Sequence, residues 1–206
     1  MAVTLFTPFT TLLSRHSVQT TIKTIAIIAI FTPASAVFGH VVLEDQAALA
    51  GRSYKAVFKV SHGCEGSPTT AIRVALPPGF AGAKPMPKPG WKLDIKTAKL
   101  ALPYDNHGKL VTDDVSEITW VAVSKDSWLP EAYYDEFVLR GSLPGKAGEE
   151  GGRGGIKAMW FKVLQTCDKG SNDWSQIPAT GVDTKGLKSP AALLEIIPSG
   201  SAAHQH

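Results

Sequence analysis

Residues 54–60 read Tyr-Lys-Ala-Val-Phe-Lys-Val, and the alternation in this stretch decides the class of fold. Apolar side chains occupy every second position, with Lys55 and Lys59 between them, which is typical of a strand with one buried face. Similar short runs recur along the chain, and no long segment has helical periodicity. The other expected strands are residues 40–43, 71–76, 91–95, 117–123, 136–140, 156–163 and 193–197.

Turn-forming residues separate these runs. Prolines and glycines cluster at 77–79 (Pro-Pro-Gly) and at 85–90 (Pro-Met-Pro-Lys-Pro-Gly). Short strands with this spacing predict an all-β protein, an antiparallel immunoglobulin-like β-sandwich with Greek-key connections. A glycine-rich stretch at 151–155 is expected to be a mobile hairpin loop rather than a phosphate-binding loop, because no helical pattern follows it.

Residues 1–39 have the features of a secretory signal peptide. Basic residues precede an apolar run at 24–31, which is too short to span a bilayer. Two cleavage positions compete, one after Ala36 in the small-residue motif Ala-Ser-Ala and one after Gly39. In either case we expect the leader to be removed and the mature protein to be periplasmic or secreted.

Cleavage after Gly39 would make His40 the first residue of the mature protein. An N-terminal histidine carries a free α-amine and an imidazole only a few bonds apart, so it can chelate a metal ion by itself. Cleavage after Ala36 would instead leave His40 as an early residue of the first strand. The choice of cleavage site therefore decides whether this chelate can exist.

The remainder of the chain is long enough for one domain with a substantial core, residues 40–198. Residues 199–206 are expected to form a disordered polar tail, in which His204 and His206 could hold a metal loosely.

Composition limits the partners of the mature protein. The formal charge of the 206-residue chain is only +3, and two of its basic residues lie in the leader. A nearly neutral mature chain offers no reason to propose nucleic acid or an anionic membrane as a partner. No further apolar run is long enough to span a membrane, so we expect no membrane insertion of the mature chain.

Cys64 and Cys167 are the two cysteines of the chain. An exported protein with two cysteines is most simply disulfide-bonded, because its compartment is oxidising. The alternative is a pair of thiolate metal ligands.

A search for catalytic motifs indicates a protein that is not an enzyme. The sequence has no Gly-x-Ser-x-Gly elbow, no His-Glu-x-x-His helix and no P-loop. Two pairs of adjacent carboxylates occur, Asp113-Asp114 and Glu149-Glu150. Their polar context predicts solvated charges in turns rather than an acid–base pair.

Several motifs together resemble the bacterial YcnI-like family of exported copper-binding domains. The most specific is residues 60–70, Val-Ser-His-Gly-Cys-Glu-Gly-Ser-Pro-Thr-Thr. Further matching pieces are residues 40–44 (His-Val-Val-Leu-Glu), 84–91 (Lys-Pro-Met-Pro-Lys-Pro-Gly-Trp), 133–137 (Tyr-Tyr-Asp-Glu-Phe) and 167–170 (Cys-Asp-Lys-Gly). The resemblance covers nearly the whole mature chain.

This resemblance implies an immunoglobulin-like sandwich that holds copper(II) at the mature N-terminal histidine, a monohistidine brace. On this chain it implies His40 as the brace, Glu136 as the carboxylate ligand and Trp174 as a covering aromatic. Glu44 is the rival carboxylate, and ordinary core packing is the alternative for Trp174. His62 is expected to fix a turn beside the disulfide rather than to bind the ion.

Two functions follow from these residues. The first is a copper(II) carrier in copper trafficking or homeostasis, whose partner would be a membrane copper importer or a copper-enzyme assembly protein. The alternative is a copper oxidoreductase of the lytic polysaccharide monooxygenase type, a class that uses a second histidine to reach three nitrogen donors. A carboxylate as the second donor favours copper(II) and therefore the carrier.

Overall fold

A computed structural model describes residues 39–145 and 157–198. Residues 1–38 of the predicted signal peptide, Glu149-Glu150, the glycine-rich stretch and the tail with His204 and His206 lie outside the described residues. Within the described residues, no helix is long and apolar enough to cross a bilayer.

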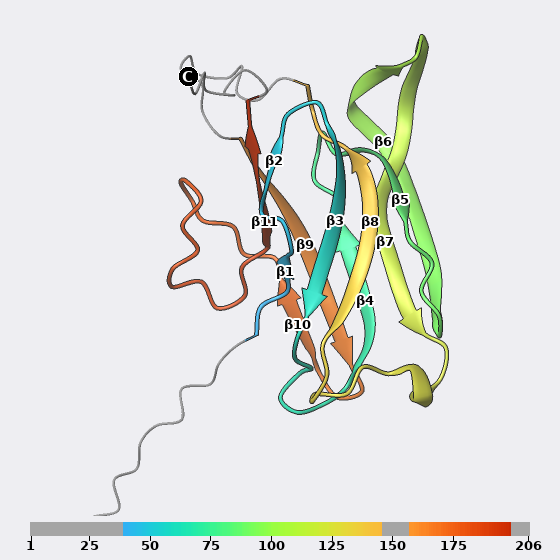
Figure 1. Cartoon of the computed structure of the whole chain (residues 1–206), viewed down its shortest axis with the longest axis vertical. Coiled ribbons are helices and arrows are strands. Elements are labelled where there is room, and N and C mark those ends of the chain that lie inside the picture. The colour runs from blue at the N-terminus through green and yellow to red at the C-terminus, as the bar shows by residue number, and fades with distance from the viewer. Residues whose placement is uncertain (1–38, 146–156, 199–206) are drawn as a thin grey trace, which may run out of the picture. The chain divides into compact units, whose positions relative to one another are not determined.

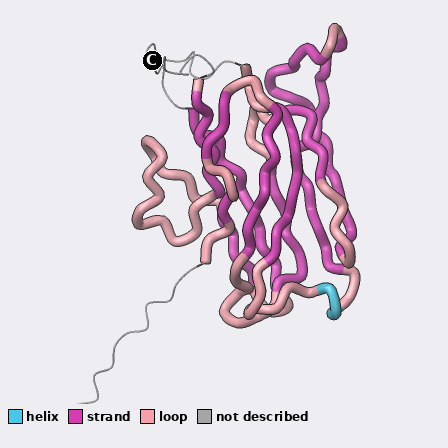
Figure 2. Tube along the Cα trace, in the orientation of Figure 1, coloured by secondary structure: helices cyan, strands magenta, loops and turns pink. Residues whose placement is uncertain are grey.

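Strands form nearly all of the regular structure in the described residues (Figure 2). They are β1 (Val42–Leu43), β2 (Ala47–Leu49), β3 (Ser53–Val60), β4 (Thr69–Ala75), β5 (Ala81–Pro85), β6 (Trp91–Asn106), β7 (Lys109–Ala122), β8 (Asp135–Ser142), β9 (Lys157–Cys167), β10 (Ser171–Trp174) and β11 (Ala192–Ile197). A single turn of 3₁₀ helix, Lys125–Ser127, interrupts the connection from β7 to β8.

The strands form two sheets (Figure 1). The smaller sheet has the order β1-β3-β8-β5, and the larger has the order β2-β11-β9-β4-β7-β6, with β10 paired to β9. All of these pairings are antiparallel except β2 with β11, which is parallel. The arrangement confirms the predicted all-β sandwich, and each expected strand is present with shifted ends.

Alternation in β3 produces the core as the sequence predicted. Tyr54, Ala56, Phe58 and Val60 are all buried, and they belong to one apolar cluster that joins both sheets. Aromatic rings fill its interior, with Phe58 against Phe161 and Trp120 against Phe137 in edge-to-face contacts. Such contacts add to the stabilisation from burying the rings.

The paired carboxylates Asp113-Asp114 do not lie in a turn, and that prediction is wrong. They belong to β7, which pairs with β6 in a hairpin far longer than expected. The Asp114 carboxylate accepts hydrogen bonds from the Gly82 amide (2.7 Å) and the Tyr104 hydroxyl (2.9 Å). The hairpin reverses at His107 and Gly108, whose φ angles of 53° and 80° suit a tight hairpin turn.

Candidate metal centre

His40 lies two residues before β1, which is an edge strand of the smaller sheet. Val41 and Leu43 point into the core and are 2 % and 1 % exposed, so they hold this short segment in place. Val42 faces the other way and pairs with Lys59 of β3. The imidazole of His40 is half-buried rather than free in solvent.

Trp174 ends β10, where it pairs with Val163 of β9. Its indole meets the His40 imidazole edge to face, with 5.5 Å between ring centroids. Trp174 is only 3 % exposed and belongs to the apolar core. The structure shows the core packing, and the role of Trp174 as a covering aromatic stays a prediction, which its contact with His40 makes testable.

A network of buried polar side chains is hydrogen-bonded to the indole of Trp174. The indole Nε1–H donates to Gln165 Oε1 (3.0 Å), and the amide nitrogen of Gln165 donates to Thr69 Oγ1 (2.8 Å). The same amide nitrogen also donates to the backbone carbonyl of His62. Gln165 and Thr69 are 1 % and 0 % exposed, and they are the buried polar side chains of the described residues.

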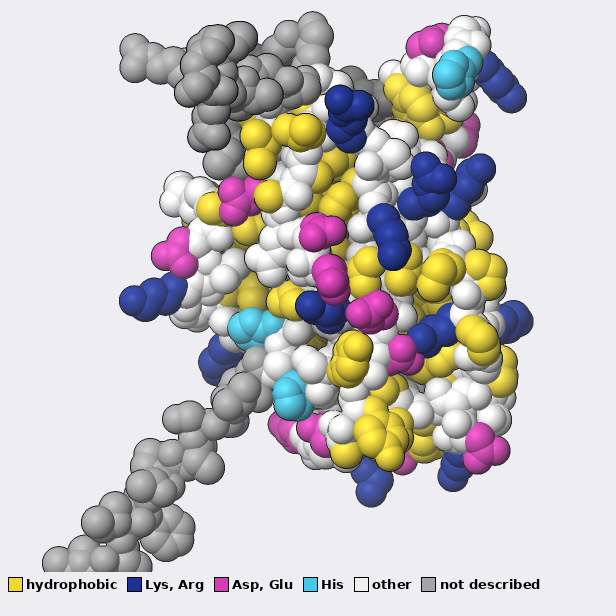
Figure 3. Space-filling model, viewed as in Figure 1, with side chains coloured by type: hydrophobic (Ala, Val, Ile, Leu, Met, Phe, Trp, Pro, Cys, Tyr) yellow, Lys and Arg dark blue, Asp and Glu magenta, His cyan; other side chains and the backbone are white. Residues whose placement is uncertain are grey.

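The side chain of His62 lies beside the residue that precedes His40. A Cβ atom built on Gly39 would meet His62 Cδ2 at 1.8 Å and Nε2 at 2.7 Å. The other ring nitrogen, Nδ1, lies 3.5 Å from Glu131 Oε1. Histidine side chains reach the surface beside the point where the chain enters the described residues, with acidic side chains close by (Figure 3). We call the group His40, His62, Glu131, Gln165 and Trp174 the His40 corner.

A small cavity of about 260 Å³ adjoins His40. Asp183 also lines this cavity, and it is a carboxylate that the sequence did not single out. Asp183 belongs to the long connection between β10 and β11, and its Oδ1 accepts a hydrogen bond from the Lys185 amide (2.8 Å). No local motif marks Asp183, because only the folding of this connection brings it near His40.

The two carboxylates named from the sequence lie on the outer face of the smaller sheet. Glu136 of β8 pairs with Lys59, which in turn pairs with Val42 of β1. Two strand spacings, about 10 Å, therefore separate β8 from β1. Glu44 forms an exposed ion pair with Lys59 (3.3 Å). No hydrogen bond or ion pair between described residues joins either carboxylate to His40, so the role of Glu136 as a ligand stays a prediction.

The disulfide between Cys64 and Cys167 is present, with 6.0 Å between the two Cα atoms. It joins the loop after β3 to the end of β9, adjacent to Gln165 and His62. Both cysteines are used in this bridge, so the alternative of two thiolate ligands is wrong.

The donors of the His40 corner fit copper(II) by type. Copper(II) prefers nitrogen and oxygen donors, and imidazoles and carboxylates are the side chains found here. Among the described residues, no three such side chains already converge on one point as a finished metal site. A free α-amine at His40 would add the missing donor, and it exists only after cleavage at Gly39.

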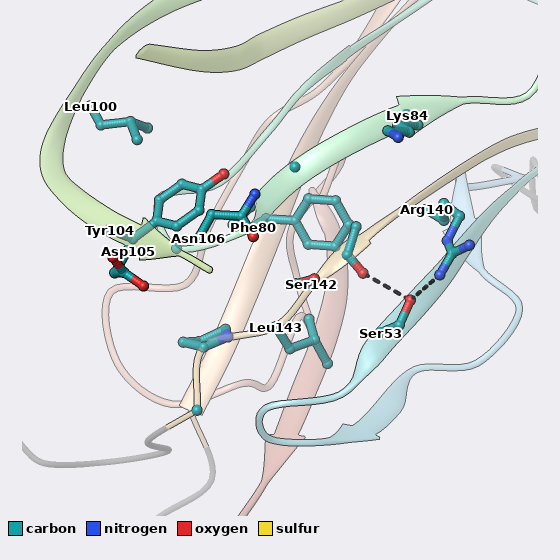
Figure 4. Close-up of a pocket in the computed structure, with 16 residues that line it drawn as sticks. Ser53, Phe80, Lys84, Leu100, Tyr104, Asp105, Asn106, Arg140, Ser142 and Leu143 are labelled. Atoms are coloured by element: carbon teal, nitrogen blue, oxygen red, sulfur yellow. Dashed lines mark hydrogen bonds between the residues drawn. The ribbon is translucent and has the colours of Figure 1, made fainter. Parts of the chain in front are cut away.

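A larger cavity of the described residues, about 700 Å³ in volume, lies elsewhere. Its lining includes Phe80 and Tyr104, together with Arg140, whose guanidinium donates to Ser53 Oγ at 2.9 Å (Figure 4). It shares no residue with the cavity beside His40 and holds no cluster of metal-binding side chains. The volume of a cavity therefore does not by itself identify the candidate metal centre of this domain.

Comparison with known families identifies the class of domain. The family model "Domain of unknown function (DUF1775)" matches residues 40–196. The chain belongs to this family, which is the YcnI-like domain family that the sequence motifs resemble. The match begins at His40, the residue on which the candidate metal centre depends.

Solved structures show the fold alone. The chain is similar to an uncharacterized protein from Nocardia farcinica with an immunoglobulin-like fold, at 22% identity and a TM-score of 0.55. That match covers 77% of this chain and 98% of the other. A type II cohesin domain from the cellulosome of Acetivibrio cellulolyticus matches at 10% identity and a TM-score of 0.33, over 75% and 92% of the two chains. No curated protein matches the chain.

Proposed function

We propose that this protein is an exported copper(II)-binding protein, active in the periplasm or outside the cell in copper trafficking or homeostasis. The observation that carries the proposal is the edge-to-face contact between His40 and the buried indole of Trp174. If cleavage makes His40 the N-terminus, its imidazole would be packed against a buried side chain instead of being exposed at a free chain end.

The chemistry of the proposed site follows from the donors. The α-amine and Nδ1 of a terminal His40 form a chelate ring on copper(II), and a carboxylate such as Glu136 supplies an oxygen donor. The indole of Trp174 is a poor donor, so its contribution is to exclude water and hold the imidazole ring. An anionic oxygen donor favours copper(II) over copper(I), which supports a carrier that delivers copper to a membrane importer or an assembly protein.

The decisive experiment compares two versions of the mature protein. One begins at His40 and the other retains residues 37–39. We expect the first to bind one copper(II) and the second to bind at least about tenfold more weakly, because the extension converts the α-amine into an amide. Competition with a chelator of known affinity measures both, and acetylation of the His40 amine is the matched control. Equal affinities would refute the brace.

A second experiment separates the candidate carboxylates. Glu136→Gln should lower copper(II) affinity and change the electron paramagnetic resonance spectrum without unfolding the domain, whereas Glu44→Gln should do less. Asp183→Asn tests the carboxylate that lines the cavity beside His40. A larger effect for Asp183→Asn than for Glu136→Gln would reassign the oxygen donor.

A third experiment tests the carrier against the oxidoreductase. With reductant and oxygen present, a carrier should release no more peroxide than the same concentration of free copper. Catalytic peroxide release above that level would contradict the carrier and favour the alternative.

A further inference from the structure

The ring of His62 lies against Gly39, next to the position that the mature N-terminus would occupy. Cδ2 is the ring atom nearest to a Cβ atom built on Gly39, at 1.8 Å, with Nε2 at 2.7 Å and Cγ at 2.8 Å, so no Cβ atom would fit there. From the 2.7 Å between that Cβ position and Nε2, standard bond lengths place His62 Nε2 within about 6.5 Å of the His40 nitrogen. Cleavage after Gly39 would free the space between these two nitrogens.

The opposite side of the same ring is held by a carboxylate. Glu131 Oε1 lies 3.5 Å from His62 Nδ1, while Glu131 Oε2 accepts a hydrogen bond from the Gly63 amide (2.6 Å). Histidines that ligate metals commonly direct one ring nitrogen to the ion and the other to a carboxylate. Nδ1 of His62 faces Glu131 in this way, and Nε2 lies on the side of the ring toward Gly39.

The backbone of His62 is also fixed. Its carbonyl accepts a hydrogen bond from Gln165, the residue that holds the indole of Trp174. The next residue must be glycine, because a Cβ atom on Gly63 would lie 1.9 Å from the Ser67 carbonyl oxygen. The turn beside the disulfide and the Gln165 hydrogen bond therefore together fix the backbone of His62.

We propose that His62 Nε2 is a further ligand of the metal held by terminal His40, with Glu131 as the residue that positions the ring. This inference rests on the proposed function, since it needs a copper(II) ion at His40. The site then has three nitrogen donors: the α-amine, the His40 imidazole and the His62 imidazole. The carboxylate remains an anionic oxygen donor beside these nitrogens, so the preference for copper(II) that supports the carrier is kept. The peroxide measurement described above separates carrier from oxidoreductase for this three-nitrogen site as well.

The test uses mature protein beginning at His40, loaded with one equivalent of copper(II). Pulsed electron paramagnetic resonance counts coordinated imidazoles from the signal of their remote nitrogens. We expect two imidazoles in the wild type and one in His62→Gln, with at least about tenfold weaker binding in the variant. His107→Asn removes a surface histidine at the hairpin turn, which tolerates asparagine, and is the matched control with two imidazoles.

Two further variants keep the test decisive if His62→Gln folds poorly. Glu131→Gln retains both histidines but should weaken binding through loss of ring orientation, without changing the number of imidazoles. In His62→Ala, added free imidazole should restore the second imidazole signal. One imidazole in the wild type, with unchanged affinity in both His62 variants, would overturn the role of His62 and leave the His40 brace intact. A wild type that binds no copper would overturn the proposed function itself, and with it this inference.

Discussion

Trp120 and Trp174 are both buried tryptophans, but they occupy two differently built regions of the sandwich. Trp120 lies in the apolar interior, fully buried, with its ring against Phe137 and its Nε1–H bonded to the Met86 carbonyl (3.2 Å). Trp174 lies at the His40 corner, where its Nε1–H is bonded to the side chain of Gln165. The hydrogen-bond acceptor of the Trp120 indole is a backbone carbonyl, and that of the Trp174 indole is a buried amide side chain.

This difference indicates what each region contributes. Apolar side chains in the interior stabilise the fold through burial. Buried polar side chains contribute less net stability and fix geometry more strictly, because each unpaired group would be costly. Thr69 and Gln165, the buried polar side chains of the described residues, both belong to the network under Trp174. The His40 corner therefore has the construction expected of a positioned site.

The largest expected effect comes from removing the disulfide beside the His40 corner. The bridge closes a loop with a sequence separation of 103 residues. Cys64→Ser combined with Cys167→Ser should lower the free energy of unfolding by about 4–5 kcal/mol on the chain-entropy model. Chemical denaturation measures the loss. A loss below about 1 kcal/mol would show that the bridge stabilises the fold far less than its loop length predicts.

Truncating the interior tryptophan should have the next largest effect. Trp120→Ala removes a fully buried ring and should lower the free energy of unfolding by about 3–5 kcal/mol. The affinity of the folded protein for copper(II) should stay within about twofold of the wild type, since no hydrogen bond or ring contact between described residues joins Trp120 to the His40 corner. A large loss of copper affinity in folded Trp120→Ala would break the distinction between the two regions.

Trp174→Phe should have a smaller effect on stability and a larger one on copper. Phenylalanine retains an aromatic ring but leaves Gln165 Oε1 without its donor, which should cost about 1–3 kcal/mol. Copper(II) exchange should become faster, because the indole that holds the imidazole of His40 is gone. Stopped-flow transfer to a chelator measures the exchange. Unchanged exchange with a stability loss as large as that of Trp120→Ala would make Trp174 purely a core residue.

The smallest expected effect is optical. Copper(II) added to protein beginning at His40 should quench the part of the tryptophan fluorescence that comes from Trp174, since its ring centroid lies 5.5 Å from that of His40. The other four tryptophans of the chain dilute this signal. The quenched component should be absent in Trp174→Phe and retained in Trp128→Phe. Equal quenching in both variants would place the ion away from Trp174.

The sequence alone predicted the sandwich, eight of the strands and the disulfide, because these depend on local alternation, turn residues or, for the disulfide, the expected export. It also pointed to His40 and Trp174 through the family motifs. It missed β2, β5 and β10 as strands. Ala47–Leu49 and Ser171–Trp174 are too short to show alternation, and Ala81–Pro85 contains glycine and proline. Asp113-Asp114 was assigned to a turn because charged strand residues and charged turn residues look alike in a single sequence.

Only the tertiary structure decided which side chains surround His40. His62 lies in the loop after β3, Glu131 lies before β8, and Asp183 lies between β10 and β11. None of these positions has a local pattern that points to His40. Their proximity comes from the pairing of strands distant in sequence and from the Gln165 amide, which links the backbone of His62 to the indole of Trp174. Such long-range packing depends on the whole core. The pattern of residues along the chain could therefore identify His40, but it could not show that His62, Glu131 and Asp183 lie near it.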